Sequence, residues 1–172
     1  MNIAFISDVH GVPGALRKAL AIADAFGAER IALLGDLMYH GPRNGVPGMY
    51  DPVEVAELLN ARRSSIVAVR GNCDTEVDQV MLQFPMMSDY AELWADGKLF
   101  FLTHGHIWNE YRLPPLPDGS ILCHGHTHTP VKHVLPDGTT IFNPGSVALP
   151  RAGSERTMGL WDGSTLKHIK LS

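Results

Sequence analysis

Seven residues of the kinds that bind divalent metal ions lie in short polar motifs along this 172-residue sequence. They are Asp8, His10, Asp36, Asn72, His104, His126 and His128. Carboxylates and imidazoles suit borderline ions such as Mn, Fe, Zn and Co. Two ions roughly 3.5–4 Å apart can activate a shared water and stabilise both the attacking and the leaving oxygen of an in-line displacement. The residue types therefore indicate phosphoryl-transfer chemistry.

Each of the motifs follows an apolar run that is typical of a buried strand. The runs are residues 3–6, 31–34, 66–69, 98–103 and 121–124, and the motifs are Asp8-Val9-His10-Gly11, Gly35-Asp36, Gly71-Asn72-Cys73-Asp74, His104-Gly105-His106 and Gly125-His126-Thr127-His128. In an α/β sheet, the loops beyond the carboxyl ends of the strands collect at one edge, where ligands bind. Any one motif is common in ordinary turns, but the whole series favours convergence on one site.

The first half of the chain predicts alternating strands and helices. Helical spacing over residues 14–26 ends at Gly27, a favourable C-cap, and Asp51-Pro52-Val53-Glu54 is typical of a helix start. That second helix should run to about residue 62, and a short helix should cover residues 75–82. This order of elements predicts parallel strands that are joined by right-handed crossovers and covered on both faces.

The second half of the chain predicts mostly strands. They are expected at residues 91–95, 98–103, 120–123, 130–135, 139–142, 157–161 and 165–169. The turn pairs Asp96-Gly97, Asp137-Gly138 and Asp162-Gly163 indicate hairpins. We therefore expect one α/β domain over residues 1–172, in which two sheets pack face to face with helices outside.

The composition excludes several classes of protein. Hydrophobic residues make up 45% and charged residues 19% of the chain, as in globular proteins. No apolar run approaches the ~20 residues of a membrane span and no signal-peptide pattern is present, so we expect a cytoplasmic protein without a membrane partner. The net charge of −4 and the absence of Lys/Arg runs argue against an extended nucleic-acid surface. A metal-loaded site would still attract a small anion, so a small phosphoester is the expected substrate.

The motifs described above resemble those of a known family. Their order, DxH, GD, GN, H and GHxH, is similar to that of the calcineurin-like metallophosphoesterase superfamily over residues 8–128. Residues 35–44, 70–74 and 142–146 resemble, more narrowly, the small bacterial YfcE-type phosphodiesterases. The resemblance implies an α/β/β/α sandwich of four layers, with two mixed sheets inside and helices outside, which agrees with the elements expected from the pattern.

The resemblance also implies a role for each ligand. One metal ion is expected on Asp8, His10 and His128, the other on Asn72, His104 and His126, and Asp36 is expected to bridge them. Manganese is the metal that the resemblance favours, with Zn, Fe, Ni or Co as alternatives. The implied reaction is hydrolysis of a phosphodiester by attack of a metal-bridging hydroxide on phosphorus.

One position departs from the family pattern. Many members carry His after the GN asparagine, where it is thought to protonate the leaving group, but this sequence has Cys73. A thiol has a pKa of ~8.5 when unperturbed and matches the role poorly. We therefore expect low turnover or a preference for good leaving groups such as aryl oxides. His106, His40 or a metal-bound water are alternative proton donors.

Two residues of the Pro/Gly-rich loop at about residues 38–50 are candidates for substrate binding. The planar fork of Arg43 suits a phosphate, although a surface arginine after a proline turn is an equal alternative. His40 is expected to line the pocket, with a plain turn histidine as the alternative. His106, two residues past a proposed ligand, is a catalytic candidate that could equally serve packing.

Two other functions remain open for the same set of motifs. The chain could be a phosphomonoesterase, or a non-catalytic protein-interaction scaffold like the retromer scaffold subunit of eukaryotes, which resembles this fold but lacks a complete ligand set. All seven ligand positions are filled here, which favours the enzyme. Methionines such as Met81 and Met87, together with edge strands, also suggest a homo-oligomer.

Overall fold

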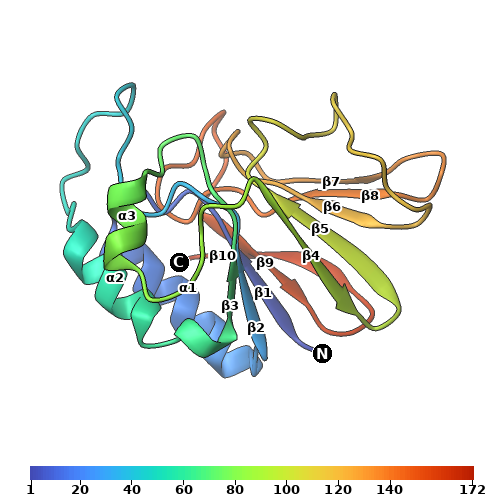
Figure 1. Cartoon of the computed structure of the whole chain (residues 1–172), viewed down its shortest axis with the longest axis horizontal. Coiled ribbons are helices and arrows are strands. Elements are labelled where there is room, and N and C mark those ends of the chain that lie inside the picture. Colours follow the sequence, from blue (N-terminus) through green and yellow to red (C-terminus); the bar gives the residue numbers. More distant parts are fainter.

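The computed structural model describes residues 1–172, and its strands form two five-stranded mixed sheets (Figure 1). The first sheet has the order β10-β9-β1-β2-β3, with β10 at Leu166–Lys170, β9 at Thr157–Trp161, β1 at Ile3–Ile6, β2 at Arg30–Leu33 and β3 at Ile66–Ala68. The second has the order β4-β5-β6-β8-β7, with β4 at Tyr90–Ala95, β5 at Lys98–Thr103, β6 at Ile121–Cys123, β8 at Thr140–Asn143 and β7 at Val131–Val134. The predicted pair of mixed sheets is confirmed.

The alternation of side chains along β1 shows why the first sheet is buried on both faces. Ala4 and Ile6 pack into the core on the helix side, whereas Ile3 and Phe5 pack into the core between the two sheets. Successive residues of a strand point to opposite faces, so an unbroken apolar run requires cover on each. Between the sheets, the ring of Phe5 lies 5.7 Å from that of Phe100 across the interface.

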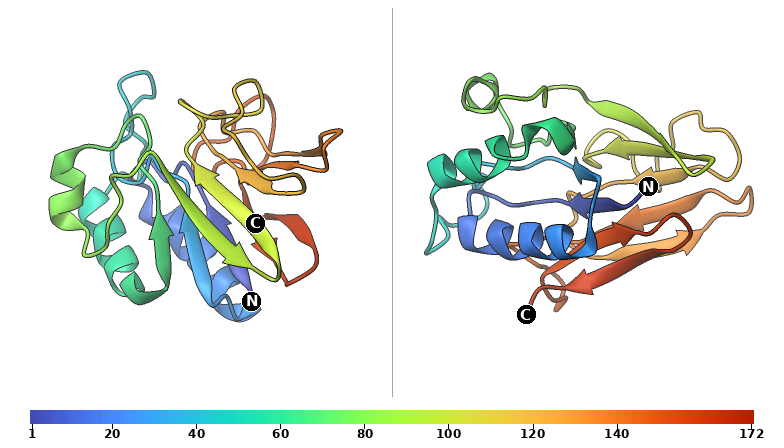
Figure 2. Two further views of the ribbon diagram at one scale, coloured as in Figure 1. Left: turned by 45° about the vertical axis from the view of Figure 1, so that its right-hand side comes forward. Right: turned by 90° about the horizontal axis from the view of Figure 1, so that it is seen from below.

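The helices gather on one side of the first sheet, and a second view shows the same arrangement (Figure 2). They are α1 at Pro13–Phe26, α2 at Pro52–Asn60, α3 at Glu76–Met81 and a 3₁₀ turn at Arg63–Ser65. Gly27 ends α1 at a left-handed φ of 72°, and the side chain of Asp51 accepts the backbone N–H of Glu54 at the start of α2. Both caps were expected from the sequence.

The outer face of the second sheet is covered differently from that of the first. Phe101, Leu122 and Ile141 point outward there and pack against Trp108 and Leu116 of the segment between β5 and β6. This segment forms no helix, and its run Pro114-Pro115-Leu116-Pro117 cannot sustain one because each proline lacks the N–H that a helix needs. The fourth layer of the sandwich is therefore an irregular loop.

The parallel pairings bring the polar motifs to one edge of the molecule. β1 pairs with β2 and β2 with β3 in parallel, and β5, β6 and β8 are likewise parallel neighbours. The carboxyl ends of these strands meet at the upper edge in Figure 1. No helix in the structure is long and apolar enough to cross a membrane.

Candidate metal centre

Three of the predicted ligands form a first group after β1 and β6. The Nε2 atoms of His10 and His128 lie 3.2 Å apart. Oδ1 of Asp8 lies 3.3 Å from Nε2 of His128 and 3.9 Å from Nε2 of His10. All three side chains are buried, so these atoms converge on one small volume that could hold a cation.

Three other predicted ligands form a second group after β3, β5 and β6. Nε2 of His104 lies 3.1 Å from the carbonyl oxygen Oδ1 of Asn72 and 3.3 Å from Nδ1 of His126. His104 is fully buried, while Asn72 is exposed, so this group opens toward solvent. Two imidazole nitrogens and an amide oxygen form a donor set suited to a divalent ion.

Asp36, which follows β2, lies between the two groups. Its Oδ2 atom is 3.6 Å from Nε2 of His10 and 3.4 Å from Nε2 of His104. Its Oδ1 atom accepts the backbone N–H of Cys73 at 2.8 Å. One oxygen is thus held by the protein backbone while the other is directed at both groups, which is the arrangement that a bridging carboxylate needs.

The donor atoms fit metal ions by two further observations. Oδ1 of Asp8 is buried without any hydrogen-bond partner, and a cation would satisfy it. The Nδ1 atoms of His10, His104 and His128 face the backbone carbonyls of Tyr39, Leu34 and Leu149. A proton on each Nδ1 leaves the Nε2 lone pair free to bind a metal, as is usual for histidine ligands.

Five of the seven ligand residues adopt backbone conformations that L-residues seldom use. The φ angles are 56° at Asp8, 48° at His10, 54° at Asp36, 69° at His126 and 60° at His128. A left-handed conformation costs roughly 1–2 kcal/mol for a residue with a side chain. Such strain concentrates at functional sites, where the surrounding structure over-determines the backbone.

Asp74 holds the loops after β2 and β3 together. Its buried carboxylate accepts the N–H groups of Asp36 at 2.7 Å, Leu37 at 2.9 Å and Gly71 at 2.7 Å. A Cβ atom on Gly71 would lie 2.1 Å from Oδ1 of Asp36, so only glycine allows this approach. The GN-x-D motif thereby fixes the position of Asp36 from the neighbouring strand.

The end of β8 and the segment that follows it hold the loops of the first group in place by hydrogen bonds. Oγ of Ser146 donates to the backbone carbonyl of Asp8 at 2.8 Å, and Nδ2 of Asn143 donates to the carbonyl of Gly125 at 2.8 Å. Both side chains are fully buried. The stretch 143–146 therefore positions the DxH and GHxH motifs without facing the ligand volume.

Burial and mutual charge shift the ionisation of the ligands. Burial raises the pKa of Asp8 to about 7. Burial alone would raise the pKa of Asp36 and lower that of His104, but their hydrogen bond and opposite charges hold the pKa of Asp36 well below its usual range and raise that of His104 to about 9. Burial lowers the pKa of His126 and of His128 to about 4. In the metal-free protein, a proton on His104 compensates part of the buried negative charge.

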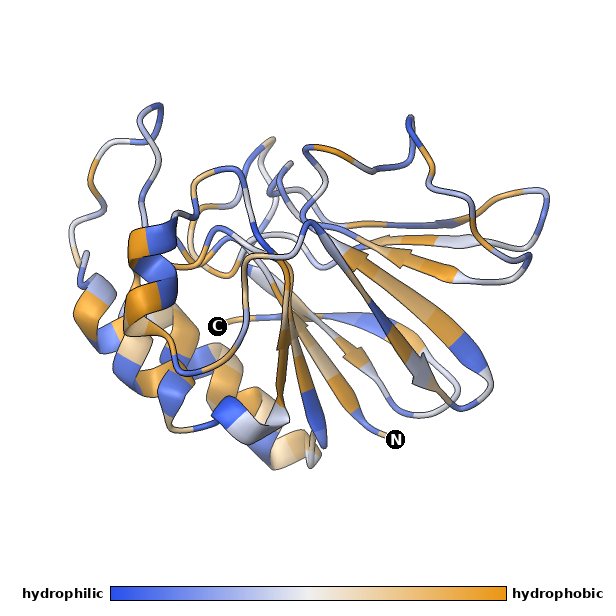
Figure 3. Cartoon of the chain, in the orientation of Figure 1, coloured by the Kyte–Doolittle hydropathy of each residue, from blue (hydrophilic) through white to orange (hydrophobic).

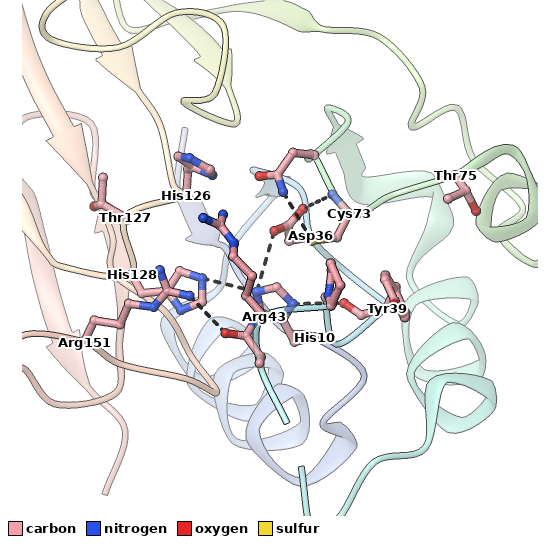
Figure 4. Close-up of a pocket in the computed structure, with 14 residues that line it drawn as sticks. His10, Asp36, Tyr39, Arg43, Cys73, Thr75, His126, Thr127, His128 and Arg151 are labelled. Atoms are coloured by element: carbon pink, nitrogen blue, oxygen red, sulfur yellow. Dashed lines mark hydrogen bonds and ion pairs between the residues drawn. The ribbon is translucent and has the colours of Figure 1, made fainter. Parts of the chain in front are cut away.

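The ligands open onto a cavity of about 560 Å³ (Figure 4). Its lining combines ligands with residues of the loops after β2, β3, β6 and β8: His10, Asp36, Tyr39, Gly41, Pro42, Arg43, Asn44, Asn72, Cys73, Thr75, His126, Thr127, His128 and Arg151. Arg43 lines the cavity, as the sequence suggested. Nη2 of Arg151 donates to Oδ1 of Asn44 at 3.0 Å, which ties the loop after β8 to the loop after β2.

Two candidates lie outside this cavity lining. Nδ1 of His40 faces the carbonyls of Gly41 at 2.8 Å and Asn44 at 3.2 Å, so this histidine fixes the shape of its own loop. His106 is half-buried beside the second group, with its ring 5.4 Å from that of His104 and 6.3 Å from that of His126. The structure brings His106 next to the ligands but brings neither histidine to the cavity wall.

Arg151 is the charged lining residue that was not among the candidates indicated by the sequence, and Tyr39, Thr75 and Thr127 were not among them either. Arg151 is exposed and follows Pro150 in a loop between β8 and β9, far along the chain from every ligand motif. No spacing or composition signal separates it from other surface arginines. Cys73 lines the cavity as expected, and burial raises the pKa of its thiol to about 12.

Comparison with known proteins agrees with this geometry. Residues 1–165 match the model of the calcineurin-like phosphoesterase superfamily domain. The chain is 40% identical over its 172 residues to phosphodiesterase YfcE of Escherichia coli K12, covering all of this chain and 93% of that protein. The solved structure of E. coli YfcE, described as a phosphoesterase, superposes with a TM-score of 0.94 at 36% identity, with both chains fully covered.

Two more distant proteins share the architecture. Phosphodiesterase MJ0936 of Methanocaldococcus jannaschii is 26% identical over 153 residues, which is 84% of this chain and 83% of that protein. Vps29 of Chaetomium thermophilum superposes with a TM-score of 0.62 at 17% identity, covering 94% of this chain and 79% of Vps29. At that identity, the likeness to Vps29 concerns the fold alone.

We predict that Asp74→Asn weakens metal binding although Asp74 is not itself a ligand. The amide would point an N–H group at backbone N–H donors, so the stability of the metal-free protein should fall by about 1–3 kcal/mol. The affinity for Mn²⁺ should fall by about 10- to 100-fold, as when other supports of metal ligands are removed. Calorimetric titration and urea unfolding measure both effects. Asp24→Asn, in an exposed ion pair with Arg62, is the control, and equal affinities for the two variants would contradict the prediction.

We also predict that metal affinity increases with pH. Metal ions must displace the proton on His104, whose pKa is raised to about 9, and below about pH 7 also a proton on Asp8. The Kd for Mn²⁺ should therefore fall by about tenfold per pH unit between about pH 7 and 9, and more steeply below. Titrations in buffers of different ionisation enthalpy count the released protons. A Kd that does not change over this range would contradict the prediction.

Proposed function

We propose that the chain, which belongs to the calcineurin-like phosphoesterase superfamily, is a metal-dependent phosphodiesterase whose active site is the cluster described above. The observation that carries the proposal is the position of Asp36, with one carboxylate oxygen within 3.6 Å of a histidine from each ligand group. The names of two relatives, YfcE and MJ0936, support the same reaction. Phosphodiester hydrolysis is thus the activity that fits both the site and the family.

In this proposal each group of ligands holds one divalent ion. Asp8, His10 and His128 would hold the first ion, Asn72, His104 and His126 would hold the second, and Asp36 would contribute a carboxylate to both. We propose manganese as the ion because the resemblance to the YfcE-type phosphodiesterases favours it, while Zn, Fe, Ni and Co are also compatible with this set of carboxylate, imidazole and amide ligands. When bound, two such ions supply an activated water and neutralise the charge that develops on phosphate oxygens.

The chain's own residues bind and orient the phosphate. Arg43 and Arg151 stand on the cavity wall, and each presents a planar fork that suits phosphate oxygens. The loop after β2 carries Arg43 and the loop after β8 carries Arg151, and the bond from Arg151 to Asn44 sets their separation. The guanidinium groups of Arg43 and Arg151, one on each loop, would hold an anionic diester over Asp36.

The leaving group must depart with little help from Cys73. The thiol lines the cavity beside Asp36 but is an intrinsically weak acid. An aryl oxide can leave unprotonated, whereas an alkoxide needs a proton. We therefore propose that the enzyme favours diesters with good leaving groups.

The complete ligand set argues against the alternative of a binding scaffold. A scaffold has no need to strain five ligand residues into left-handed conformations or to bury an unpartnered carboxylate oxygen. We further propose a single domain over residues 1–172 that acts in the cytoplasm on a small phosphoester, and that copies associate into a homo-oligomer.

The Asp36→Asn variant tests the bridging role directly. Loss of one negative charge would weaken the binding of both ions at once. Hydrolysis of bis(p-nitrophenyl) phosphate with Mn²⁺ should therefore fall by about 10³-fold, comparable to the loss of a principal electrostatic element. Wild-type activity should also disappear with EDTA and return with Mn²⁺. Asp24→Asn is the matched control. Wild-type turnover by a folded Asp36→Asn protein would overturn the bridge, and no metal-dependent activity in the wild type would favour the scaffold.

The Cys73→His variant tests the missing proton donor. An imidazole beside Asn72 should raise hydrolysis of esters with poor leaving groups, toward the lower end of the ~10²–10⁴-fold that general acids contribute. Activity toward alkyl phosphate monoesters should rise relative to bis(p-nitrophenyl) phosphate, whose aryl oxide leaves without a proton and whose hydrolysis should change little. Cys73→Ser keeps the size but provides no better acid and should show no gain. An unchanged ratio in Cys73→His would count against the leaving-group argument.

A further inference from the structure

A second cavity, of about 370 Å³, lies beside the metal-binding cavity. It is open to solvent and is bordered by both ends of the loop after β2, the start of α2 and one side of α3. Its lining is mostly apolar and includes Met38, Tyr39, Tyr50, Pro52, Val77 and Met81. Figure 3 shows that hydrophobic and polar residues alternate along α3. A concave apolar surface of this kind is the usual form of a small-molecule subsite.

The two cavities adjoin each other. Tyr39 and Thr75 line both of them. In Figure 4 these two residues stand on one side of the metal-binding cavity, across from Thr127 and Arg151. A molecule whose phosphate lies over Asp36 can therefore extend past Tyr39 and Thr75 into the second cavity.

The cavities differ sharply in chemistry. The metal-binding cavity is lined by polar and charged side chains, with two hydrophobic residues among fourteen. The second has five hydrophobic residues among eight. A phosphodiester has the same division, because its phosphate is anionic while its ester substituents are carbon-rich. The adjoining cavity offers such a substituent a more uniformly apolar surface than the metal-binding cavity does.

The apolar cavity has a fixed aromatic wall. A Cβ atom at Gly11 would lie 2.3 Å from the ring of Tyr50, so this ring packs directly on the backbone of the DxH loop. The N–H of Asp51 also donates to the carbonyl of Gly11 at 2.8 Å. Tyr50 is thus positioned by the same loop that carries His10, and Tyr39 stands at the junction between the cavities. Rings and thioethers such as those of Met38 and Met81 favour contact with a flat aromatic group.

We propose that this apolar cavity is a substrate subsite that binds a ring-bearing ester substituent of the phosphodiester. The proposal rests on the proposed function and names its substrate class, a diester with at least one aromatic or heteroaromatic group close to phosphorus. The ring lies against Tyr39 and Tyr50, with Val77 and Met81 beneath it. The phosphate stays over Asp36, between Arg43 and Arg151.

The test compares two matched variants of α3, Val77→Gln and Val80→Gln. Val77 lines the cavity and is 70% exposed, whereas Val80 is 86% exposed and does not line it, so neither change should affect folding. With Mn²⁺ present, Val77→Gln should raise the KM for bis(p-nitrophenyl) phosphate and the inhibition constant of phenylphosphonate. Each should rise by about tenfold, the lower end of what one methylene-sized apolar contact contributes to discrimination. Inhibition by inorganic phosphate should not change, and Val80→Gln should match the wild type.

Three results would overturn the subsite. One is an equal KM for the two variants; another is an equal loss of phosphate and phenylphosphonate binding in Val77→Gln, which would indicate a disturbed metal site. The third is a change of oligomeric state, measured as the mass of the protein in solution, that occurs only in Val77→Gln and leaves KM unchanged. That result would indicate that the cavity is an interface between copies of the protein. Calorimetric binding of phenylphosphonate to the Mn²⁺-loaded protein needs no turnover. An inactive wild type would therefore count against the proposed function, while the binding difference between variants would still report on the cavity.

Discussion

Two carboxylates, Asp8 and Asp36, are buried within the same few ångströms as three buried imidazoles. Burying charge away from water is costly unless the charge is compensated, and an unpartnered carboxylate oxygen adds to that cost. Without metal, a proton on His104 and the raised pKa of Asp8 relieve part of the charge. Divalent cations relieve it more completely, since they also satisfy the free oxygen of Asp8 and the facing nitrogens of His10 and His128. The fold brings these charged groups together, and this close approach is what makes compensation by cations necessary.

The direction of the strands brings the ligand residues together. Six parallel strands from two sheets end at one edge, so ligands that are up to 120 positions apart in sequence, such as Asp8 and His128, become neighbours. The turns that follow are tight enough to force left-handed backbone at ligand residues that carry side chains. Gly71 and Asp74 supply the close approach and the hydrogen bonds that hold this backbone in place. Phe5 and Phe100 pack against each other in the core between the two sheets, which holds the two sheets together. The free energy gained by burying this core offsets the strain of the left-handed ligand residues.

The sequence predicted most of the elements, and it indicated candidate ligands that the structure brings together; the reasons are local. Unbroken apolar runs mark strands that are buried on both faces, and Asp-Gly pairs mark hairpins, so these need no tertiary information. Metal-type residues identify themselves by their chemistry. Arg151 and the apolar cavity could not be predicted, because both depend on how exposed loops of no fixed pattern fold over the sheet edge. His40 shows the same limit, since its position in the loop suggested the pocket while its hydrogen bonds to Gly41 and Asn44 turn it into the loop. Likewise, the sequence does not show that a proline-rich loop replaces the outer helices on the second sheet.

The contrast between strand ends and exposed loops separates the residues that carry the reaction from the residues that select the substrate. The reacting centre is built at strand ends, where backbone position is fixed by the sheets, and it supplies chemistry that any phosphoester could undergo. Selection then falls to the loops and to α3, which lie beyond the sheet and contribute Tyr39, Tyr50 and Val77. Under the two proposals made above, a thiol at position 73 would restrict the reaction to leaving groups that need no proton, and the adjoining apolar cavity would favour ring-bearing esters. Both would select the same kind of substrate, because a phenol is at once a good leaving group and an apolar one.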